Sequence, residues 1–162
     1  MNGLNDENGL STLVACFKNH MNSYEQDFFA WTQEQSRYLN ARQFAELDIE
    51  NLVEEIQAMG RSERRELQSR LTVLLVHLLK WQFQPTRRGR IWQLTLEEQR
   101  DNCLDVMEDN PGLKNQLDTL TSRAYARAKT TASKETGLDK TTFPPVCPWS
   151  YEQMMDTDFF PD

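Results

Sequence analysis

Carboxylates and a histidine are the residues of this chain whose types and spacing could support catalysis. Asp48 and Glu55 stand in an acidic stretch with Glu50 and Glu54, and His77 follows further along. Paired carboxylates can act as acid and base or hold hard metal ions, and histidine titrates near neutral pH. One hypothesis is therefore an acid/base or metal-dependent enzyme that uses Asp48, Glu55 and His77.

Structural roles also account for these residues. Acidic side chains in the first turn of a helix interact favourably with the helix dipole. His77 lies at the edge of an apolar stripe, where it could simply bond to a neighbouring helix. The spacings Glu-x-x-His and His-Glu-x-x-His are absent, which excludes di-iron and zincin sites. We assign no metal ligand, and the sequence leaves any cofactor unknown.

A long apolar stripe must position these residues. Apolar side chains recur at the steps of three and four that are typical of a helix with one buried face; they are Ile49, Leu52, Val53, Ile56, Leu67, Leu71, Leu74, Leu78 and Trp81. Gly60 and Ser62 interrupt the stripe, because glycine favours a helix C-terminus and serine an N-cap. The stretch is either one helix over 47–81, about 52 Å long, or two helices that reverse at Gly60. The unusual length of a single helix slightly favours the reversal.

The two alternatives decide whether the candidate residues can meet. On one straight helix Glu55 and His77 lie about 33 Å apart and cannot cooperate. With a reversal at Gly60, Asp48 faces roughly residue 74, within about one turn of His77. Only the hairpin therefore makes an Asp48–His77 site possible within one chain.

Start signals predict helices on either side of the stripe. Residues 23–38 are expected to form the first helix, with Ser23 and Gln26 as its capping box. A second capping box at Thr95 is expected to open the helix that follows the stripe. Such boxes satisfy backbone N–H groups that the first turn of a helix leaves without partners.

The C-terminal part of the chain is predicted to be a helix followed by a tail. Asn110 and Pro111 begin the helix, and Gly137 closes it. The tail over 143–162 holds four of the six prolines together with several aromatic residues. It should therefore be extended or turned and pinned to the bundle by its aromatic side chains.

These elements together predict an all-α fold, a helical bundle of four to five helices with a Pro-rich extended C-terminal tail. Residues 1–22 are expected to be a flexible extension, because Asn, Asp, Gly and Ser dominate their first dozen positions. Residues 23–162 are expected to form a single helical domain, and a chain of 162 residues has the size of one domain.

A short basic loop is a second candidate for binding. Pro85 ends the helix of the apolar stripe, and Arg87, Arg88 and Arg90 follow it, with Lys80 and two tryptophans nearby. Guanidinium groups beside indole rings could hold a phosphate or stack on bases. A solvated loop that pairs with the excess of acids explains the same residues. Anion or nucleic-acid binding through this loop is therefore an alternative hypothesis.

The composition limits the classes of function. The net charge is −7, from 18 basic and 25 acidic residues, which argues against broad nucleic-acid binding. No window approaches the roughly 20 apolar residues of a membrane helix, and the N-terminus lacks the pattern of a signal peptide. The three cysteines are far apart and suit a reducing compartment. We therefore expect a cytoplasmic protein without a membrane partner.

The order of short motifs resembles a family known as domain of unknown function twenty-nine, which is mainly cyanobacterial and uncharacterised. The resemblance spans about residues 23–161 and is carried by Tyr24, Asp27, Trp31, Leu47-Asp48, Asn51-Leu52, Glu54-Glu55-Ile56, Met59-Gly60, Arg64, Glu66-Leu67, His77-Leu78-Leu79-Lys80-Trp81, Gln84-Pro85, Trp92, Phe143-Pro144 and Cys147-Pro148-Trp149. It implies an almost wholly helical fold. It brings no established activity, cofactor or partner.

The hypothesis that we favour from the sequence is a small cytosolic interaction module. The two-sided apolar stripe, the aromatic-rich helices and the lack of a complete catalytic set indicate a protein that binds itself, as a homodimer, or another protein. The acid/base or metal-dependent enzyme and the Arg87–Arg90 anion binder remain the alternatives.

Overall fold

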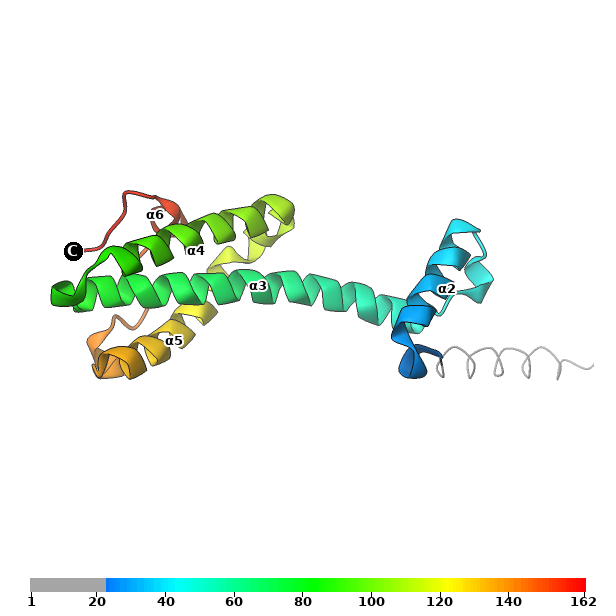
Figure 1. The fold of residues 1–162 in the computed structure, drawn as a ribbon, viewed down its shortest axis with the longest axis horizontal. Helices are drawn as coiled ribbons and strands as arrows, with labels where there is room; N and C mark the ends of the chain where they lie inside the picture. The colour runs from blue at the N-terminus through cyan, green and yellow to red at the C-terminus, as the bar shows by residue number, and fades with distance from the viewer. Residues whose placement is uncertain (1–22) are drawn as a thin grey trace, which may run out of the picture. The chain divides into compact units, whose positions relative to one another are not determined.

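The computed structural model describes residues 23–162, and all regular structure in that range is helical (Figure 1). The prediction that residues 1–22 form a flexible extension lies outside the described residues. The α-helices are α2 (Phe28–Asn40), α3 (Ile49–Phe83), α4 (Arg90–Asp109), α5 (Leu117–Thr136) and α6 (Tyr151–Met155). Short 3-10 helices connect them, namely η1 (Phe44–Glu46), η2 (Pro85–Arg87), η3 (Pro111–Gln116) and η4 (Lys140–Thr142). The predicted all-α fold is confirmed.

The described residues divide into two compact units, with the boundary between Ala58 and Met59. In its described part, the first unit holds α2, η1 and the beginning of α3. The second unit holds the rest of α3 and all later elements. The single domain expected over 23–162 stays a prediction, and each unit is described by itself below.

Helix α3 continues through Gly60 without a break, so the favoured reversal at this residue is wrong. A glycine inside a helix costs only about 1 kcal/mol relative to alanine, and the charged residues that follow Gly60 are good helix formers. No atom outside the local helix backbone lies within 4 Å of the place where a Gly60 side chain would begin. Gly60 is therefore an ordinary helical position, and Ser62 caps no new helix.

The first unit starts its helix later than the sequence predicts. Residues 23–26 are helical, Asp27 interrupts the helix, and α2 begins at Phe28. Its N-cap is Asp27, whose carboxylate accepts a hydrogen bond of 2.9 Å from the backbone N–H of Ala30. Ser23 is therefore not the cap of α2. Asp27 caps α2 in place of Ser23 because Asp is as good an N-cap residue as Ser.

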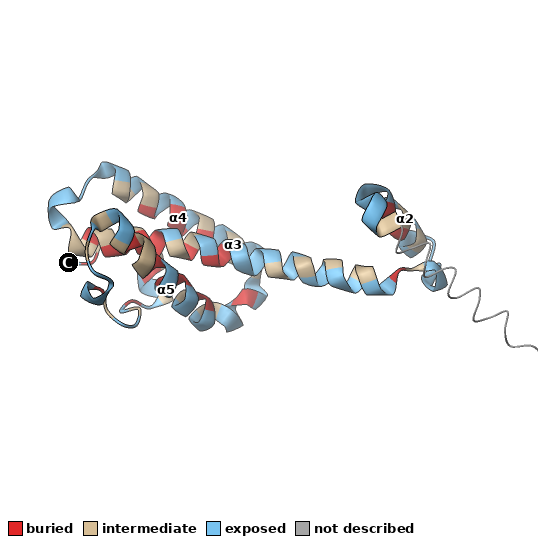
Figure 2. Cartoon of the chain, turned by 90° about the horizontal axis from the view of Figure 1, so that it is seen from below, coloured by how far each residue is buried: buried red, intermediate tan, exposed pale blue. Residues whose placement is uncertain are grey.

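The second unit is a bundle in which α3, α4 and α5 lie side by side (Figures 1 and 2). Glu63 of α3 meets Asn110 at the end of α4, so these helices run in opposite directions. Lys80 meets Glu135 near the ends of α3 and α5, which therefore run in the same direction. The side chains facing the centre are completely or almost completely buried and include Leu67, Leu71, Leu74, Leu75, Leu78, Leu79, Leu96, Cys103, Leu120, Ala124, Ala128 and Ala132.

The core of this unit follows the predicted stripe of α3, and its helix ends follow simple local rules. The alanines of α5 repeat every fourth residue, which lets the backbones of neighbouring helices approach closely. Gly137 ends α5 with a φ of 76°, a left-handed conformation that favours glycine, as predicted.

The predicted start at Thr95 is wrong. Helix α4 begins at Arg90 with Gly89 as its N-cap, and the Thr95 hydroxyl instead donates to the carbonyl of Ile91 at 3.0 Å. A threonine can make this bond to the preceding turn inside a helix, so its sequence pattern does not distinguish a cap from a helical position.

The C-terminal tail is pinned to the second unit, as predicted, but it is not wholly extended. Phe143 and Trp149 are buried, and the ring of Phe160 lies 4.9 Å from that of Trp81. The sequence analysis missed α6, a short helix that Ser150 and Gln153 open with a capping box. Five residues are too few for the apolar periodicity to reveal a helix.

A buried arginine holds the end of this tail. Arg100 of α4 is completely buried and donates to the carbonyls of Met154 at 2.8 Å, Thr157 at 3.2 Å and Phe159 at 2.5 Å. Burial lowers the pKa of Arg100, while Asp156 and nearby acids raise it. We call this arrangement the Arg100 clasp; it gives the buried cation three acceptors without a carboxylate.

Candidate functional site

Asp48 lies at the N-cap position of α3 in the first unit. Its carboxylate accepts hydrogen bonds from the Trp31 indole at 3.1 Å, the Asn51 side chain at 2.7 Å and the Asn51 backbone at 3.3 Å. Its backbone N–H donates to the buried side chain of Gln35 at 2.8 Å. These contacts satisfy both carboxylate oxygens, so Asp48 is used to join α2 to the start of α3.

Glu55 lies in the same unit, about two turns further along α3. Its carboxylate accepts a hydrogen bond from the hydroxyl of Tyr24. This bond, with burial and nearby negative charge, raises the pKa of Tyr24 to about 12, so that phenol stays protonated and keeps donating at neutral pH. Tyr24 in turn packs edge-on against the ring of Trp31, with centroids 4.9 Å apart.

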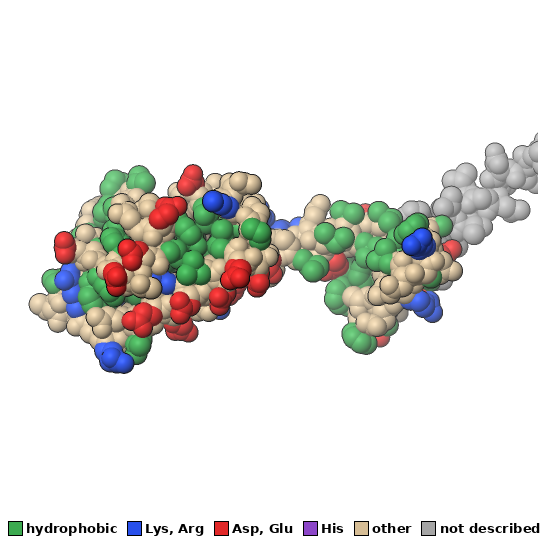
Figure 3. Space-filling view, turned by 90° about the horizontal axis from the view of Figure 1, so that it is seen from above, with side chains coloured by type: hydrophobic (Ala, Val, Ile, Leu, Met, Phe, Trp, Pro, Cys, Tyr) green, Lys and Arg blue, Asp and Glu red, His purple; other side chains and the backbone are tan. Residues whose placement is uncertain are grey.

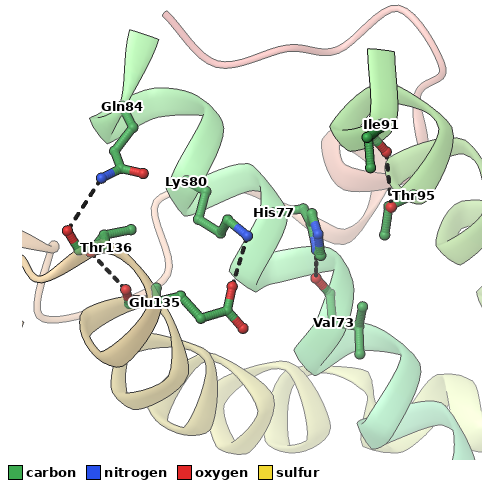
Figure 4. A network of polar contacts seen from close by, with 9 residues as sticks. Val73, His77, Lys80, Gln84, Ile91, Thr95, Glu135 and Thr136 are labelled. Carbon is green, nitrogen blue, oxygen red and sulfur yellow. Dashed lines mark hydrogen bonds and ion pairs between the residues drawn. The ribbon is translucent and has the colours of Figure 1, made fainter. Parts of the chain in front are cut away.

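His77 lies in the second unit, half-buried on α3 (Figure 4). Its Nδ1 is 2.9 Å from the carbonyl oxygen of Val73, one turn earlier in the same helix. Burial lowers the pKa of the imidazole, and the positive charge of Lys80 acts in the same direction. A neutral ring that donates from Nδ1 therefore fits its surroundings at pH 7.

Of the three residues of the enzyme hypothesis, Asp48 and Glu55 share their surroundings, because Tyr24 donates to Glu55 and packs on Trp31, which donates to Asp48. The hydrogen bonds of Asp48 and Glu55 stay within the first unit, and that of His77 stays within its own helix turn. The reversal at Gly60, by which the sequence analysis joined Asp48 to His77, does not occur. Within residues 23–162, no three His, Cys, Asp or Glu side chains gather in a way that could hold a metal ion.

Two of the four cations proposed for anion binding, Lys80 and Arg88, make contacts with other residues of the second unit. Lys80 pairs with Glu135 at 2.7 Å (Figure 4). Its ammonium group also lies 4.8 Å from the ring centroid of Trp92. Arg88 donates to the carbonyl of Trp81 at 2.8 Å and stacks on its ring. Lys80 and Arg88 therefore hold the fold together.

Arg87 and Arg90 are exposed on and beside η2. Arg88 is exposed as well, but its guanidinium group is engaged with Trp81. Anion or nucleic-acid binding at this loop stays a prediction.

An open cleft of about 550 Å³ lies between α5 and the tail of the second unit. Cys147 and Tyr151 line it, and the Tyr151 hydroxyl is buried without a hydrogen-bond partner. Burial raises the pKa of the Cys147 thiol, although a hydrogen bond involving the backbone of Trp149 lowers it slightly. Because the thiolate is the nucleophile, this environment does not activate Cys147.

Arginines line a second groove in this unit, which the sequence analysis missed. Arg61, Arg64 and Arg65 come from α3, and Arg123 and Arg127 come from α5. Their steps of three and four would have revealed two arginine stripes if charged residues had been searched for helical periodicity as apolar residues were.

The first unit has an unusually apolar surface. Among residues 23–58 the buried side chains are Trp31, Gln35 and Asp48, of which one is hydrophobic. Large apolar side chains are instead exposed on α2, η1 and the start of α3, and Figure 3 shows such side chains at the surface of this unit. We call this set the apolar surface; it consists of Phe28, Phe29, Leu39, Phe44, Ile49, Val53 and Ile56.

The helical fold and these sites define a small α-helical protein. A model of the family described as domain of unknown function DUF29 matches residues 23–160. The chain therefore belongs to this family, as the order of its short motifs indicated. Searches of curated proteins and of solved structures gave no match. None of the helices within residues 23–162 has the length and apolar content needed to cross a membrane.

Proposed function

We propose that this chain is a helical protein–protein interaction module that self-associates through the apolar surface of its first unit. The observation that carries this proposal is the exposure of large apolar side chains there, which reaches 73% for Phe29, 66% for Ile56 and 62% for Phe44. Contiguous exposed apolar side chains on a soluble protein mark interaction sites.

The burial within residues 23–58 supports an intermolecular contact. These residues bury a single hydrophobic side chain, Trp31, and leave large apolar side chains exposed. A second copy that covers the apolar surface would bury the side chains that this described part exposes.

The spacing within α3 favours a second copy as the occupant. Ile49, Val53 and Ile56 follow one another at steps of four and three, which is the repeat by which helices pair in coiled coils. A symmetric dimer places the same patch on both partners, so each helix would meet an identical stripe. The flanking Glu50 is exposed and can point to solvent at the edge of such a contact.

A cytoplasmic location belongs to the same proposal. Within the described residues, Cys103 is buried and Cys147 is half-buried, and both are free thiols. Free thiols are the usual state in a reducing compartment.

The test is the oligomeric state of the full chain, measured by sedimentation equilibrium over a wide concentration range. Ile56→Glu is expected to weaken the dimer at least tenfold, because a charge replaces an apolar side chain worth about 1.5–3 kcal/mol when buried. Ile91→Glu is the matched control, since Ile91 is 78% exposed and belongs to the second unit. A wild-type chain that stays monomeric, or equal weakening by both substitutions, would contradict the proposal.

A further inference from the structure

The arginine groove lies between α3 and α5 of the second unit and has a volume of about 290 Å³. Its lining contains the five arginines named above together with Gln68, Gln116, Thr119 and Leu120. The lining has no acidic and no aromatic side chain. A concentration of five positive charges is notable in a chain whose net charge is −7.

Helix periodicity places these arginines on facing stripes. Arg61, Arg65 and Gln68 are separated by four and three residues on α3, and Arg123 and Arg127 by four on α5. Residues at these steps share one face of a helix. The arginine stripes of α3 and α5 both line this one groove.

The guanidinium groups of the groove have no counter-charge among the described residues. Within residues 23–162, none of the five pairs with a carboxylate, and the ion pairs found are Arg37–Glu34, Arg70–Glu66 and Lys80–Glu135. The acids of α3 nearest in sequence are engaged elsewhere: Glu66 pairs with Arg70 at 2.7 Å, and Glu63 accepts from Asn110 at 3.1 Å. Five cations that line one groove repel each other weakly across solvent, and an anion in the groove would be attracted to all of them.

Gln68 supplies an independent sign of a missing ligand. Its side chain lines the groove and is only 8% exposed, yet its Nε2 has no hydrogen-bond partner. A buried donor without an acceptor is unfavourable and rare in folded proteins. An anion in the groove could accept a hydrogen bond from Gln68 and compensate the arginines at the same time.

From these features we infer that the groove binds a compact anion with two or more phosphoryl groups. A guanidinium group matches phosphate with paired hydrogen bonds. A single phosphate group carries at most about two negative charges at pH 7, whereas the groove presents five positive ones. Two or three linked phosphoryl groups therefore match the charge better than one.

The polar lining indicates that the ligand is recognised by its phosphoryl groups. Nucleobases are commonly held by stacking on aromatic rings, and none lines this groove. The groove also lies along the beginning of α5, where the helix dipole favours negative charge. An inorganic polyphosphate or the phosphate chain of a nucleotide presents the required chemistry.

The inference is tested by calorimetric titration of the full chain with orthophosphate, tripolyphosphate and a nucleoside triphosphate at one fixed ionic strength. Tripolyphosphate is expected to bind at least tenfold more tightly than orthophosphate. Equal affinity for tripolyphosphate and the nucleoside triphosphate would assign the phosphate chain alone as the ligand. A tenfold preference for the nucleoside triphosphate would assign a nucleotide.

Paired substitutions keep the test specific to the groove. Arg65→Gln with Arg123→Gln is expected to weaken tripolyphosphate binding at least a hundredfold and to raise the unfolding temperature of the free protein, because it relieves repulsion. Arg87→Gln with Arg90→Gln removes the same charge from the exposed loop and should change the affinity less than threefold.

Gln68→Leu is expected to change tripolyphosphate affinity and the stability of the free protein in opposite directions. It is expected to weaken tripolyphosphate binding about tenfold and to make the free protein more stable, because it removes a buried donor that has no partner. Failure of tripolyphosphate to bind would overturn the inference, even if a single-stranded RNA bound the chain. Equal losses of affinity in the groove and loop double variants would overturn it as well, because binding would then follow net charge alone.

Discussion

The two compact units of this chain are held together by different forces. In the described part of the first unit, hydrogen bonds to Asp48 join α2 to α3 around a single buried tryptophan. In the second unit, leucines of α3 pack against α4, α5 and the tail in a continuous core, shown as the red residues of Figure 2. The apolar side chains of α3 are thus exposed near its start, at Ile49, Val53 and Ile56, and buried in a core from Leu67 onward. The same residue types therefore have different energetic roles in the two units.

Removal of one apolar side chain from each unit gives the largest expected contrast. Leu75→Ala should lower the free energy of unfolding by about 2–5 kcal/mol, because Leu75 is fully buried and a cavity remains. Val53→Ala should lower it by no more than about 0.5 kcal/mol at concentrations where the chain is monomeric, because Val53 is exposed.

Urea denaturation followed by circular dichroism measures both values. Similar losses in the two variants would show that the first unit has a packed core of its own. That result would remove the contrast between the units and weaken the case for a partner on the apolar surface.

A substitution at Asp48 tests the polar organisation of the first unit. Asp48→Ala should destabilise the start of α3 by about 1–2 kcal/mol, the usual loss for an N-cap. Hydrogen exchange at the Asn51 and Leu52 amides should accelerate accordingly, while amides near Leu75 should keep their rates.

Glu50→Ala serves as the control for Asp48→Ala, since Glu50 is an exposed acid in the first turn of the same helix. It loses only a dipole interaction worth about 0.3–1 kcal/mol. Faster exchange in this control than in Asp48→Ala would show that charge, and not capping, organises the first unit.

The smallest expected effect is a pH dependence from His77 in the second unit. Burial lowers the pKa of the folded imidazole below its usual 6.5, so the unfolded chain binds the proton more readily. The contribution of His77 to stability is therefore complete above pH 6.5 and is lost as the pH falls through the folded pKa.

Comparison of the wild type with His77→Asn between pH 7.5 and pH 5 isolates this contribution from that of the carboxylates. The wild type should lose more stability than the variant over this interval. An imidazole that titrates above 6.5 by NMR would contradict the prediction and would indicate an acidic partner for the ring.

Helical periodicity predicted the second unit well because that unit is organised by apolar packing. The positions of Leu67, Leu71, Leu74 and Leu78 identified the buried face of α3 correctly. The same periodicity placed Ile49, Val53 and Ile56 on that face as well, and these are exposed. A hydrophobic pattern indicates which face is apolar, but it does not indicate whether the same chain covers it.

Local signals were less reliable where two residues could serve the same role. Asp27 caps α2 in place of Ser23, and Thr95 bonds within α4 although its sequence resembles a cap. The possible reversal at Gly60 rested on helix length, and the cost of one helical glycine was too small to enforce it. The arginine groove depends on which faces of α3 and α5 meet, which a single stretch of sequence does not reveal.

The Arg100 clasp has a consequence for the order in which the second unit folds. Its acceptors lie 54 to 59 residues after Arg100, so they leave the ribosome well after α4. Until they arrive, burial of the guanidinium group would leave a cation without acceptors, so Arg100 should stay hydrated during synthesis. Docking of α4 against its final neighbours is then a late step that closes a long loop. A ribosome-bound chain stalled before Met154 should therefore lack the cooperative unfolding of the released protein.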